Sequence, residues 1–278
     1  MLLSATYADV TVGSGLGPLK NVGLTVADLV YPPIIGAALT AFRGLDLKIE
    51  IEGAENVPRA GGAVLVSNHI SYLDFLFAGL GAYKSAKRKT RFMAKDEVFK
   101  HRISGPLMRG MHHIPVDRSD GQPAYDAAVA ALRAGEVVGV FPEATISRSF
   151  MLKKFKTGAA RMAADADVPL LPVILWGTQR LWTKGRPKNL TRRHTPVSIQ
   201  IGEPIVLTPQ DRPVMVTRRL REAMGALLDR AQRDYPDQPS GPEDSWWLPT
   251  HMGGTAPTPQ QAEAEDEQAA ADKASRND

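Results

Sequence analysis

Hydrophobic and polar residues alternate in an early segment of the chain. Residues 45–52 place Leu or Ile at every second position, with Asp, Lys or Glu between them, which predicts a half-buried strand. Residues 63–67 follow a Gly-Gly pair as a short apolar run, which indicates a strand buried on both faces. Further apolar runs predict strands at 91–94, 114–116, 137–141, 168–176 and 197–201.

Segments with helical periodicity separate these predicted strands. The predicted helices cover residues 72–83, 95–109, 122–134, 156–166 and 213–234. Strands that alternate with helices are typical of an α/β domain with a central, mostly parallel sheet flanked by helices. We assign this domain to residues 45–235.

An apolar segment precedes the predicted domain. Residues 29–42 are the most apolar early run, contain two prolines and are shorter than the roughly 20 residues that span a bilayer. Residues 1–44 are therefore predicted to be an N-terminal membrane-associating helical segment that lies at the interface. An ordinary buried helix is the alternative interpretation.

The segment after the predicted domain changes in composition. Residues 236–278 are rich in Pro and then in acidic residues and Ala, which predicts disorder from about residue 255. Trp246 and Trp247 are expected to dock on the domain or to lie at a membrane interface.

Charge and composition narrow the possible partners. The 278-residue chain carries a net charge of +4, but residues 255–278 hold six acidic and two basic residues, so the remainder carries +8. This excess favours a phosphorylated ligand, nucleic acid or an anionic membrane. The chain has no Cys, and its six His show no metal-ligand spacing, so we expect neither a metal nor a cofactor.

Candidate chemistry begins directly after the predicted strand 63–67. His69 precedes Asp74 by five residues, and a continuous helix would leave their side chains about 140° apart. Contact therefore requires His69 to lie in a turn before the helix, with Ser71 as a suitable N-cap. A carboxylate on one imidazole nitrogen fixes the tautomer and leaves the other nitrogen free to act as a base.

Two more predicted strands are followed by residues that suit a phosphorylated alcohol. Arg118 follows strand 114–116, and Glu143 and Thr145 follow strand 137–141. Since the carboxyl ends of parallel strands share one edge of the sheet, we expect these loops to form one cleft with His69. There an Arg would bind the phosphate and a His would take the hydroxyl proton.

These residues occur in four blocks, in the order found in glycerolipid acyltransferases of the 1-acylglycerol-3-phosphate acyltransferase type, which the chain resembles. The blocks are Asn68-His69-x-Ser71-x-x-Asp74, Ile114-Pro-Val-Asp117-Arg118, Phe141-Pro-Glu143-x-Thr145 and Val168-Pro-Leu-Leu-Pro172-Val. The resemblance covers roughly residues 45–207 and also includes Phe155-Lys156-Thr157-Gly158-Ala159.

The resemblance implies acyl transfer from acyl-CoA or acyl-carrier protein to the hydroxyl of 1-acylglycerol-3-phosphate, giving phosphatidic acid. His69 would be the general base and Asp74 the group that orients it. The implied substrate-binding residues are Asn68, Ser71, Arg118, Glu143, Thr145, Arg148 and Lys156. The implied location is the cytoplasmic face of the cell membrane, with peripheral or monotopic attachment.

The chain departs from the family pattern at two positions. It has Ala144 and Ile146 where the family usually has Gly and Arg, so Arg148 or Lys156 would replace the missing cation. Acceptors that remain open are glycerol-3-phosphate, another lysophospholipid or a glycolipid. A non-catalytic lipid- or nucleic-acid-binding protein is the remote alternative, but the basic region 84–118 has too few interleaved aromatic residues, so we expect no nucleic-acid partner.

Overall fold

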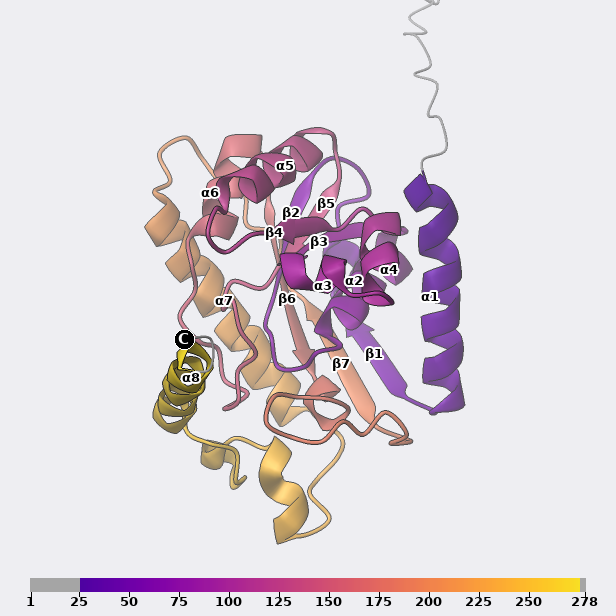
Figure 1. The fold of residues 1–278 in the computed structure, drawn as a ribbon, viewed down its shortest axis with the longest axis vertical. Helices are drawn as coiled ribbons and strands as arrows, with labels where there is room; N and C mark the ends of the chain where they lie inside the picture. Colours follow the sequence, from indigo (N-terminus) through magenta and orange to yellow (C-terminus); the bar gives the residue numbers. More distant parts are fainter. Residues whose placement is uncertain (1–25, 276–278) are drawn as a thin grey trace, which may run out of the picture.

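The computed structural model describes residues 26–275, which contain a central seven-stranded sheet flanked by helices (Figure 1). The sheet order is β1-β7-β6-β2-β5-β3-β4, and its strand pairs are parallel except β6 with β7. The predicted fold class and every predicted strand are thus confirmed. The strands are β1 Lys48–Glu52, β2 Ala63–Ser67, β3 Thr90–Lys95, β4 Ile114–Val116, β5 Val137–Val140, β6 Leu170–Trp176 and β7 Pro196–Ile201.

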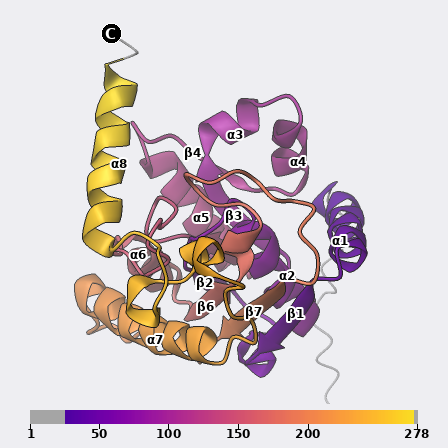
Figure 2. The same cartoon turned by 90° about the horizontal axis from the view of Figure 1, so that it is seen from below.

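The helices cover both faces of the sheet (Figure 2). They are α1 Val26–Gly44, α2 Asp74–Ala86, α3 Asp96–Lys100, α4 Ser104–Gly110, α5 Gln122–Arg133, α6 Gly158–Ala166, α7 Pro213–Arg233 and α8 Pro259–Ala274. The predicted helix over 95–109 is divided into α3 and α4. The break occurs because His101 is extended and its ring nitrogen accepts hydrogen bonds from the backbone N–H groups of Ile103 and Ser104.

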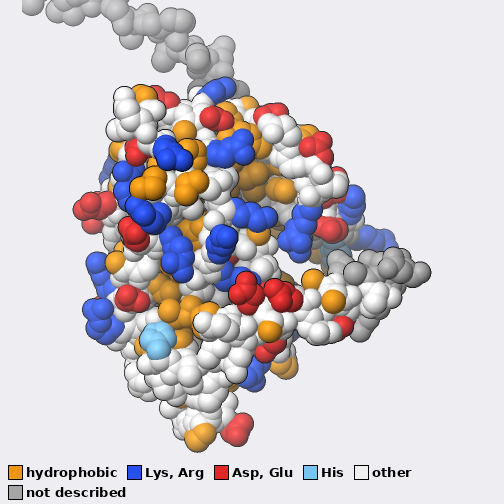
Figure 3. All heavy atoms as spheres, turned by 90° about the vertical axis from the view of Figure 1, so that its left-hand side faces the viewer, with side chains coloured by type: hydrophobic (Ala, Val, Ile, Leu, Met, Phe, Trp, Pro, Cys, Tyr) orange, Lys and Arg blue, Asp and Glu red, His pale blue; other side chains and the backbone are white. Residues whose placement is uncertain are grey.

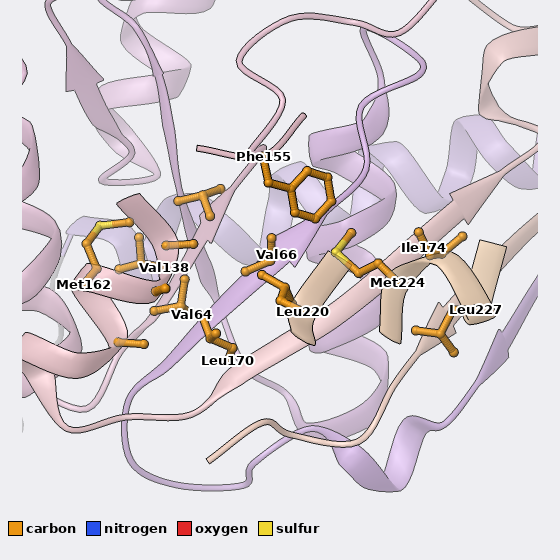
Figure 4. Packing of buried hydrophobic residues seen from close by; sticks show 14 of the residues in the cluster. Val64, Val66, Val138, Phe155, Met162, Leu170, Ile174, Leu220, Met224 and Leu227 are labelled. Carbon is orange, nitrogen blue, oxygen red and sulfur yellow. The ribbon is translucent and has the colours of Figure 1, made fainter. Parts of the chain in front are cut away.

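Strand β2 connects the two halves of the core. Val64 and Val66 point into one cluster, which contains residues of α5, α6 and α7 (Figure 4), whereas Ala63 and Leu65 point into a second cluster under α1 and α2. Because side chains alternate between the faces of a strand, both faces of β2 are buried, as its unbroken apolar sequence predicts. The core therefore holds the carboxyl end of β2 in place, and the turn that follows starts there.

Helix α1 packs against the second cluster through Tyr31, Ile35 and Phe42. The Tyr31 hydroxyl also accepts a hydrogen bond from the backbone N–H of Thr90, at 3.2 Å. The predicted N-terminal helix is confirmed for residues 26–44, whereas residues 1–25 of the predicted membrane-associating segment lie outside the described residues. Among the helices of residues 26–275, none combines the length and apolar character needed to cross a membrane.

The Pro-rich segment after α7 contributes to the first core cluster. Trp247 is fully buried, its ring centroid lies 5.5 Å from that of Tyr235, and the Arg180 guanidinium lies 4.4 Å over the Trp247 ring. Trp246 is partly buried and lies under the Arg186 guanidinium. Of the two interpretations offered for these tryptophans, docking on the domain is the one that the structure supports.

The expectation of disorder from about residue 255 is not met over residues 259–274, which form α8. A capping box begins this helix: the Thr258 side chain and the backbone N–H of Gln261 hydrogen-bond, as do the Gln261 side chain and the backbone N–H of Thr258. The prediction of disorder rested on composition, which does not reveal this cap. Composition also does not reveal the ion pairs that Asp266 makes with the domain.

Candidate active site

His69 lies in the turn between β2 and α2, where its contact with Asp74 was expected. His69 Nδ1 is 3.0 Å from Asp74 Oδ2. The ring stacks on Phe141, with 4.3 Å between centroids, which fixes its plane. About a fifth of the side chain is exposed (21%), and no protein group of the described residues hydrogen-bonds to Nε2. The nitrogen opposite Asp74 is thus available to a ligand.

Asp74 is fully buried and is held by four donors. Its Oδ2 accepts from the backbone N–H groups of Ile70, at 2.6 Å, and Ser71, at 2.7 Å, besides the contact with His69. Its Oδ1 accepts from the hydroxyl of Thr178, at 2.7 Å. Since these bonds fix both carboxylate oxygens, Asp74 is a positioning residue that sets the His69 tautomer with Nδ1 protonated.

Glu143 connects the His69 turn to a neighbouring loop. Its Oε1 accepts from the backbone N–H of His69, at 3.3 Å, and its Oε2 from that of Lys153, at 3.4 Å. The His69 carbonyl in turn accepts from the backbone N–H of Ser147, at 2.7 Å. Burial raises the pKa of Glu143 to about 8. This carboxyl therefore braces the two loops, and its contact with substrate stays a prediction.

This raised pKa predicts how stability depends on pH. Between the ordinary pKa of 4.5 and the folded pKa of about 8, the folded state binds more protons at Glu143, so the free energy of unfolding falls as the pH rises. Burial lowers the pKa of His113 from 6.5 to about 4, which acts in the opposite sense below pH 6.5. One extra bound proton changes the free energy of unfolding by about 1.4 kcal/mol per pH unit. We therefore expect the titration of Glu143 to lower the free energy of unfolding by about 2 kcal/mol between pH 6.5 and 8.

Urea unfolding at pH 6.5 and pH 8 measures this cost. The Glu143→Gln variant does not titrate, so we expect its free energy of unfolding to lose about 2 kcal/mol less than the parent over the same interval. An equal loss in both proteins would contradict the assignment.

Asn68 and Ser71, which the resemblance implies as substrate-binding residues, make contacts with the backbone. The Asn68 amide donates to the Leu175 carbonyl, at 2.9 Å, and accepts from the Leu175 backbone N–H, at 2.8 Å, which joins the end of β2 to β6. The Ser71 hydroxyl donates to the Trp182 carbonyl, at 2.7 Å, and is not the N-cap of α2, a position that Leu73 occupies. Both side chains are buried, and their polar groups form hydrogen bonds with buried backbone groups.

The predicted phosphate-binding cations lie around the loop that follows β5. Arg118 is exposed and donates to the Ala144 carbonyl, at 3.2 Å, which brings the ends of β4 and β5 together. Lys156 is exposed, and its backbone N–H donates to the Pro142 carbonyl. Arg148 is largely covered and pairs with acids of α8. Thr145 is half-buried within the same loop.

Comparison with known proteins shows which family the chain resembles. The family model described as Acyltransferase matches residues 48–176, which include the His69–Asp74 pair and the Glu143 loop. Over these residues the chain is similar to the acyltransferase family. It is 33% identical over 175 residues to the 1-acyl-sn-glycerol-3-phosphate acyltransferase of Limnanthes douglasii, covering 60% of this chain and 59% of that one.

Other proteins similar to this chain carry the same name. The Bacillus subtilis protein is 28% identical over 172 residues, covering 60% of this chain and 79% of that one. The chloroplastic Arabidopsis thaliana protein is 36% identical over 162 residues, covering 57% of this chain and 44% of that one. The chain thus spans about three fifths of the Limnanthes relative and less than half of the Arabidopsis one.

A solved structure also matches this chain. It is the crystal structure of the 1-acyl-sn-glycerophosphate (LPA) acyltransferase, PlsC, from Thermotoga maritima. The TM-score is 0.64 at 25% identity, and the match covers 76% of this chain and 83% of that chain.

Two site residues were missed in the sequence. Thr178 follows β6 and lies 104 positions from Asp74, so no local motif connects them. Thr178 nevertheless comes shortly after a buried strand, and residues in that position tend to lie at the ligand-binding edge of the sheet. The same rule pointed to Glu143, so it could have pointed to Thr178. Phe141 was noted as part of a block, but its stacking on His69 depends on the pairing of β2 with β5, which local sequence does not show.

Ala144, one of the two departures from the family pattern, has a left-handed backbone conformation with φ +59°. Because glycine adopts this conformation without the penalty that a Cβ brings, we expect Ala144→Gly to raise the free energy of unfolding by about 1 kcal/mol. Ala127→Gly, at an exposed position inside α5, is the matched control and should lower it by about 0.5–1 kcal/mol. Thermal unfolding shows both signs, and a loss of stability in both variants would contradict the argument.

Proposed function

We propose that this protein transfers a fatty acyl group from acyl-CoA or acyl-carrier protein to the free hydroxyl of 1-acylglycerol-3-phosphate, giving phosphatidic acid. The observation that carries the proposal is the His69–Asp74 pair, with an accessible Nε2, in the part of the chain that matches the acyltransferase family. The names of the relatives supply the acceptor.

The chemistry follows from the orientation of His69. Nδ1–H donates to Asp74, so Nε2 carries a lone pair and can take the proton of the acceptor hydroxyl. The hydroxyl oxygen then attacks the thioester carbonyl and forms the new ester C–O bond. When the C–S bond breaks, the thiolate takes the proton back from His69, so the imidazole returns to its initial state. The negative charge of Asp74 stabilises the imidazolium between these steps.

Acyl-transfer assays with the purified protein test the function. Radiolabelled oleoyl-CoA and oleoyl-acyl-carrier protein are each offered with lysophosphatidic acid, and the expected product is phosphatidic acid. Absence of transfer from either donor to any acceptor, together with oligonucleotide binding that weakens steeply with salt, would favour the remote alternative of a non-catalytic binding protein.

A second candidate acceptor class within the same chemistry follows from Ile146. This residue is 4% exposed and stands where the family usually has Arg, so the family's phosphate contact there is lost. Glycerol-3-phosphate, another lysophospholipid and a glycolipid therefore belong in the assay beside lysophosphatidic acid. The ratio of kcat/KM among these acceptors identifies the substrate.

We also propose that the protein acts on the cytoplasmic face of the cell membrane, as a peripheral or monotopic protein. Ile103, directly before α4, and Leu107, within α4, are 79% and 48% exposed. The basic residues Lys100 and Arg102 precede them closely in the sequence. Helix α4 also packs close to α1, since a Cβ at Gly110 would lie 3.0 Å from Val30. Exposed apolar side chains flanked by cations suit an anionic lipid surface.

Co-sedimentation with vesicles that contain anionic phospholipid tests the attachment. We expect the Ile103→Asp/Leu107→Asp variant to lose most of its vesicle-bound fraction. Val206→Asp, at a 72% exposed position, is the control and should bind as the parent does. Equal binding by all three proteins would refute this membrane surface.

A further inference from the structure

Helix α8 places one carboxylate among three cations of the domain. Asp266 Oδ2 accepts from Lys153 Nζ, at 2.6 Å, and Asp266 Oδ1 accepts from Lys184 Nζ, at 2.5 Å, and from Arg148 Nε, at 3.3 Å. Glu265 pairs with the other side of the same guanidinium, at 3.4 Å. Figure 3 shows this side of the molecule, with Lys and Arg side chains gathered on the body next to the helix that ends in the grey C-terminal residues.

The three cations, Arg148, Lys153 and Lys184, come from segments that are bonded to the turn of His69. Arg148 follows Ser147, whose backbone N–H donates to the His69 carbonyl at 2.7 Å. The backbone N–H of Lys153 donates to the Glu143 carboxyl that also accepts from His69. The cluster is therefore tied to the candidate active site on the β5 side.

Lys184 lies in the segment that follows β6, and its neighbours in the chain hydrogen-bond to the same turn. The hydroxyl of its neighbour Thr183 donates to the Ile70 carbonyl, at 2.7 Å, and the Trp182 carbonyl accepts from Ser71 and Tyr72. Arg148 and Lys184 thus stand one residue from a direct hydrogen bond to the segment around His69, and Lys153 is linked to that segment through Glu143. This shared anchorage is not expected of scattered surface lysines.

The charges of the cluster suit a phosphate better than they suit a carboxylate. Three cations face the carboxylates of Asp266 and Glu265, which leaves a local excess of positive charge. A phosphomonoester brings up to two negative charges and three acceptor oxygens, one for each cation, and Arg favours its planar, bidentate recognition. Arg148 also lies two residues beyond Ile146, the position where the family's own cation is absent.

Helix α8 is weakly attached apart from this cluster. Of residues 259–272, Ala262 is buried and Asp266 partly buried, and the others are exposed. Burial opposes ionisation of Asp266, but the hydrogen bonds and charges of Lys153 and Lys184 outweigh it and lower the pKa of this carboxyl, so it is ionised at neutral pH. A ligand that displaces one side chain therefore removes most of what holds the helix.

We propose that Arg148, Lys153 and Lys184 form a binding site for the phosphomonoester group of a lipid, and that Asp266 competes for this site as an internal occupant carried by α8. The phosphate is that of the acyl acceptor if the proposed function holds, and to that extent this inference rests on it. Binding of the phosphate then releases α8 from the domain, so the acidic helix restrains the site until an acceptor displaces it.

Titration calorimetry with glycerol-3-phosphate, a soluble phosphomonoester, tests the site. We expect Asp266→Asn to bind it about tenfold more tightly than the parent, because the internal competitor has lost its charge. Glu267→Gln, an exposed acid of the same helix, is the matched control and should leave the affinity unchanged. Adding Lys184→Ala to Asp266→Asn should cancel the gain. An Asp266→Asn variant that binds neither this ester nor phosphatidic acid in vesicles more tightly than the parent would overturn the proposal.

Hydrogen exchange and vesicles distinguish the remaining outcomes. Glycerol-3-phosphate should accelerate amide exchange in α8 of the parent protein; faster exchange in Asp266→Asn without tighter phosphate binding would mean that the cluster merely clamps the helix, and would overturn the site. A gain seen with phosphatidic acid in phosphatidylcholine vesicles but not with the soluble ester would assign the site to bilayer lipid instead of the acceptor. None of these measurements requires turnover, so failure of the proposed acyl transfer would leave them interpretable.

Discussion

His69→Ala should lower kcat at least about a hundredfold and leave KM for the phosphorylated acceptor nearly unchanged. A general base contributes about 10²–10⁴ to the rate, and its proton transfer occurs in the transition state, so its removal spares ground-state binding. The structure supports this separation, because the nitrogen that acts, Nε2, has no hydrogen-bond partner among the described protein groups. Steady-state kinetics with acyl-CoA and lysophosphatidic acid measure both parameters.

The chain supplies a matched control for this variant. His194 is exposed, and its Nδ1 lies 2.7 Å from Asp46 Oδ2, so His194→Ala removes a second His–Asp contact of similar length. That variant should turn over as the parent does, which would show that the location of His69 matters and not the pairing alone. Turnover of His69→Ala within a few-fold of the parent would rule out His69 as the base.

Much of the fold could be predicted because its signals are local. The unbroken apolar run of β2 and the alternation in β1 each reflect the faces that they bury, so periodicity alone located them. The break between α3 and α4 and the helix α8 were not predicted. Both depend on side chains that bond specific backbone or charged groups, His101 in the first and Asp266 in the second, and composition does not report such contacts.

The candidate site was predictable where its parts are close in sequence. His69 and Asp74 are five residues apart, so helix geometry was enough to require the turn that the structure contains. The same motif could not show that Asn68 and Ser71 turn toward the backbone, because a buried structural amide and a substrate-binding amide are alike in sequence. That distinction needs β6 and the loop after it, which lie more than 100 residues away.

Asp74 is expected to tolerate one substitution and not another. In Asp74→Asn, the amide oxygen can take the place of Oδ2, where it still accepts from Ile70, Ser71 and His69. The amide nitrogen then faces the Thr178 hydroxyl, which can accept as well as donate. The fold and the His69 tautomer should therefore survive, and what is lost is the negative charge beside the imidazolium.

We expect kcat of Asp74→Asn to fall about 10–100-fold, because a hydrogen bond to a charged group contributes about 1.5–3 kcal/mol. Asp74→Ala should lower the stability of the protein as well as its activity. It leaves the buried N–H groups of Ile70 and Ser71 without their acceptor, at about 1–3 kcal/mol for each, so stability and activity should fall together.

Urea unfolding and kinetics on the two Asp74 variants separate these effects, and Thr178→Val completes the design. Alone, Thr178→Val removes one donor to Oδ1 and should have a small effect on kcat. Combined with Asp74→Asn, it leaves the new amide nitrogen buried without an acceptor, so the two substitutions should destabilise the protein by more than their separate effects predict. Additive effects would mean that the Asn side chain takes the opposite orientation, with its nitrogen toward His69; the tautomer would then be lost and kcat should fall well beyond a hundredfold.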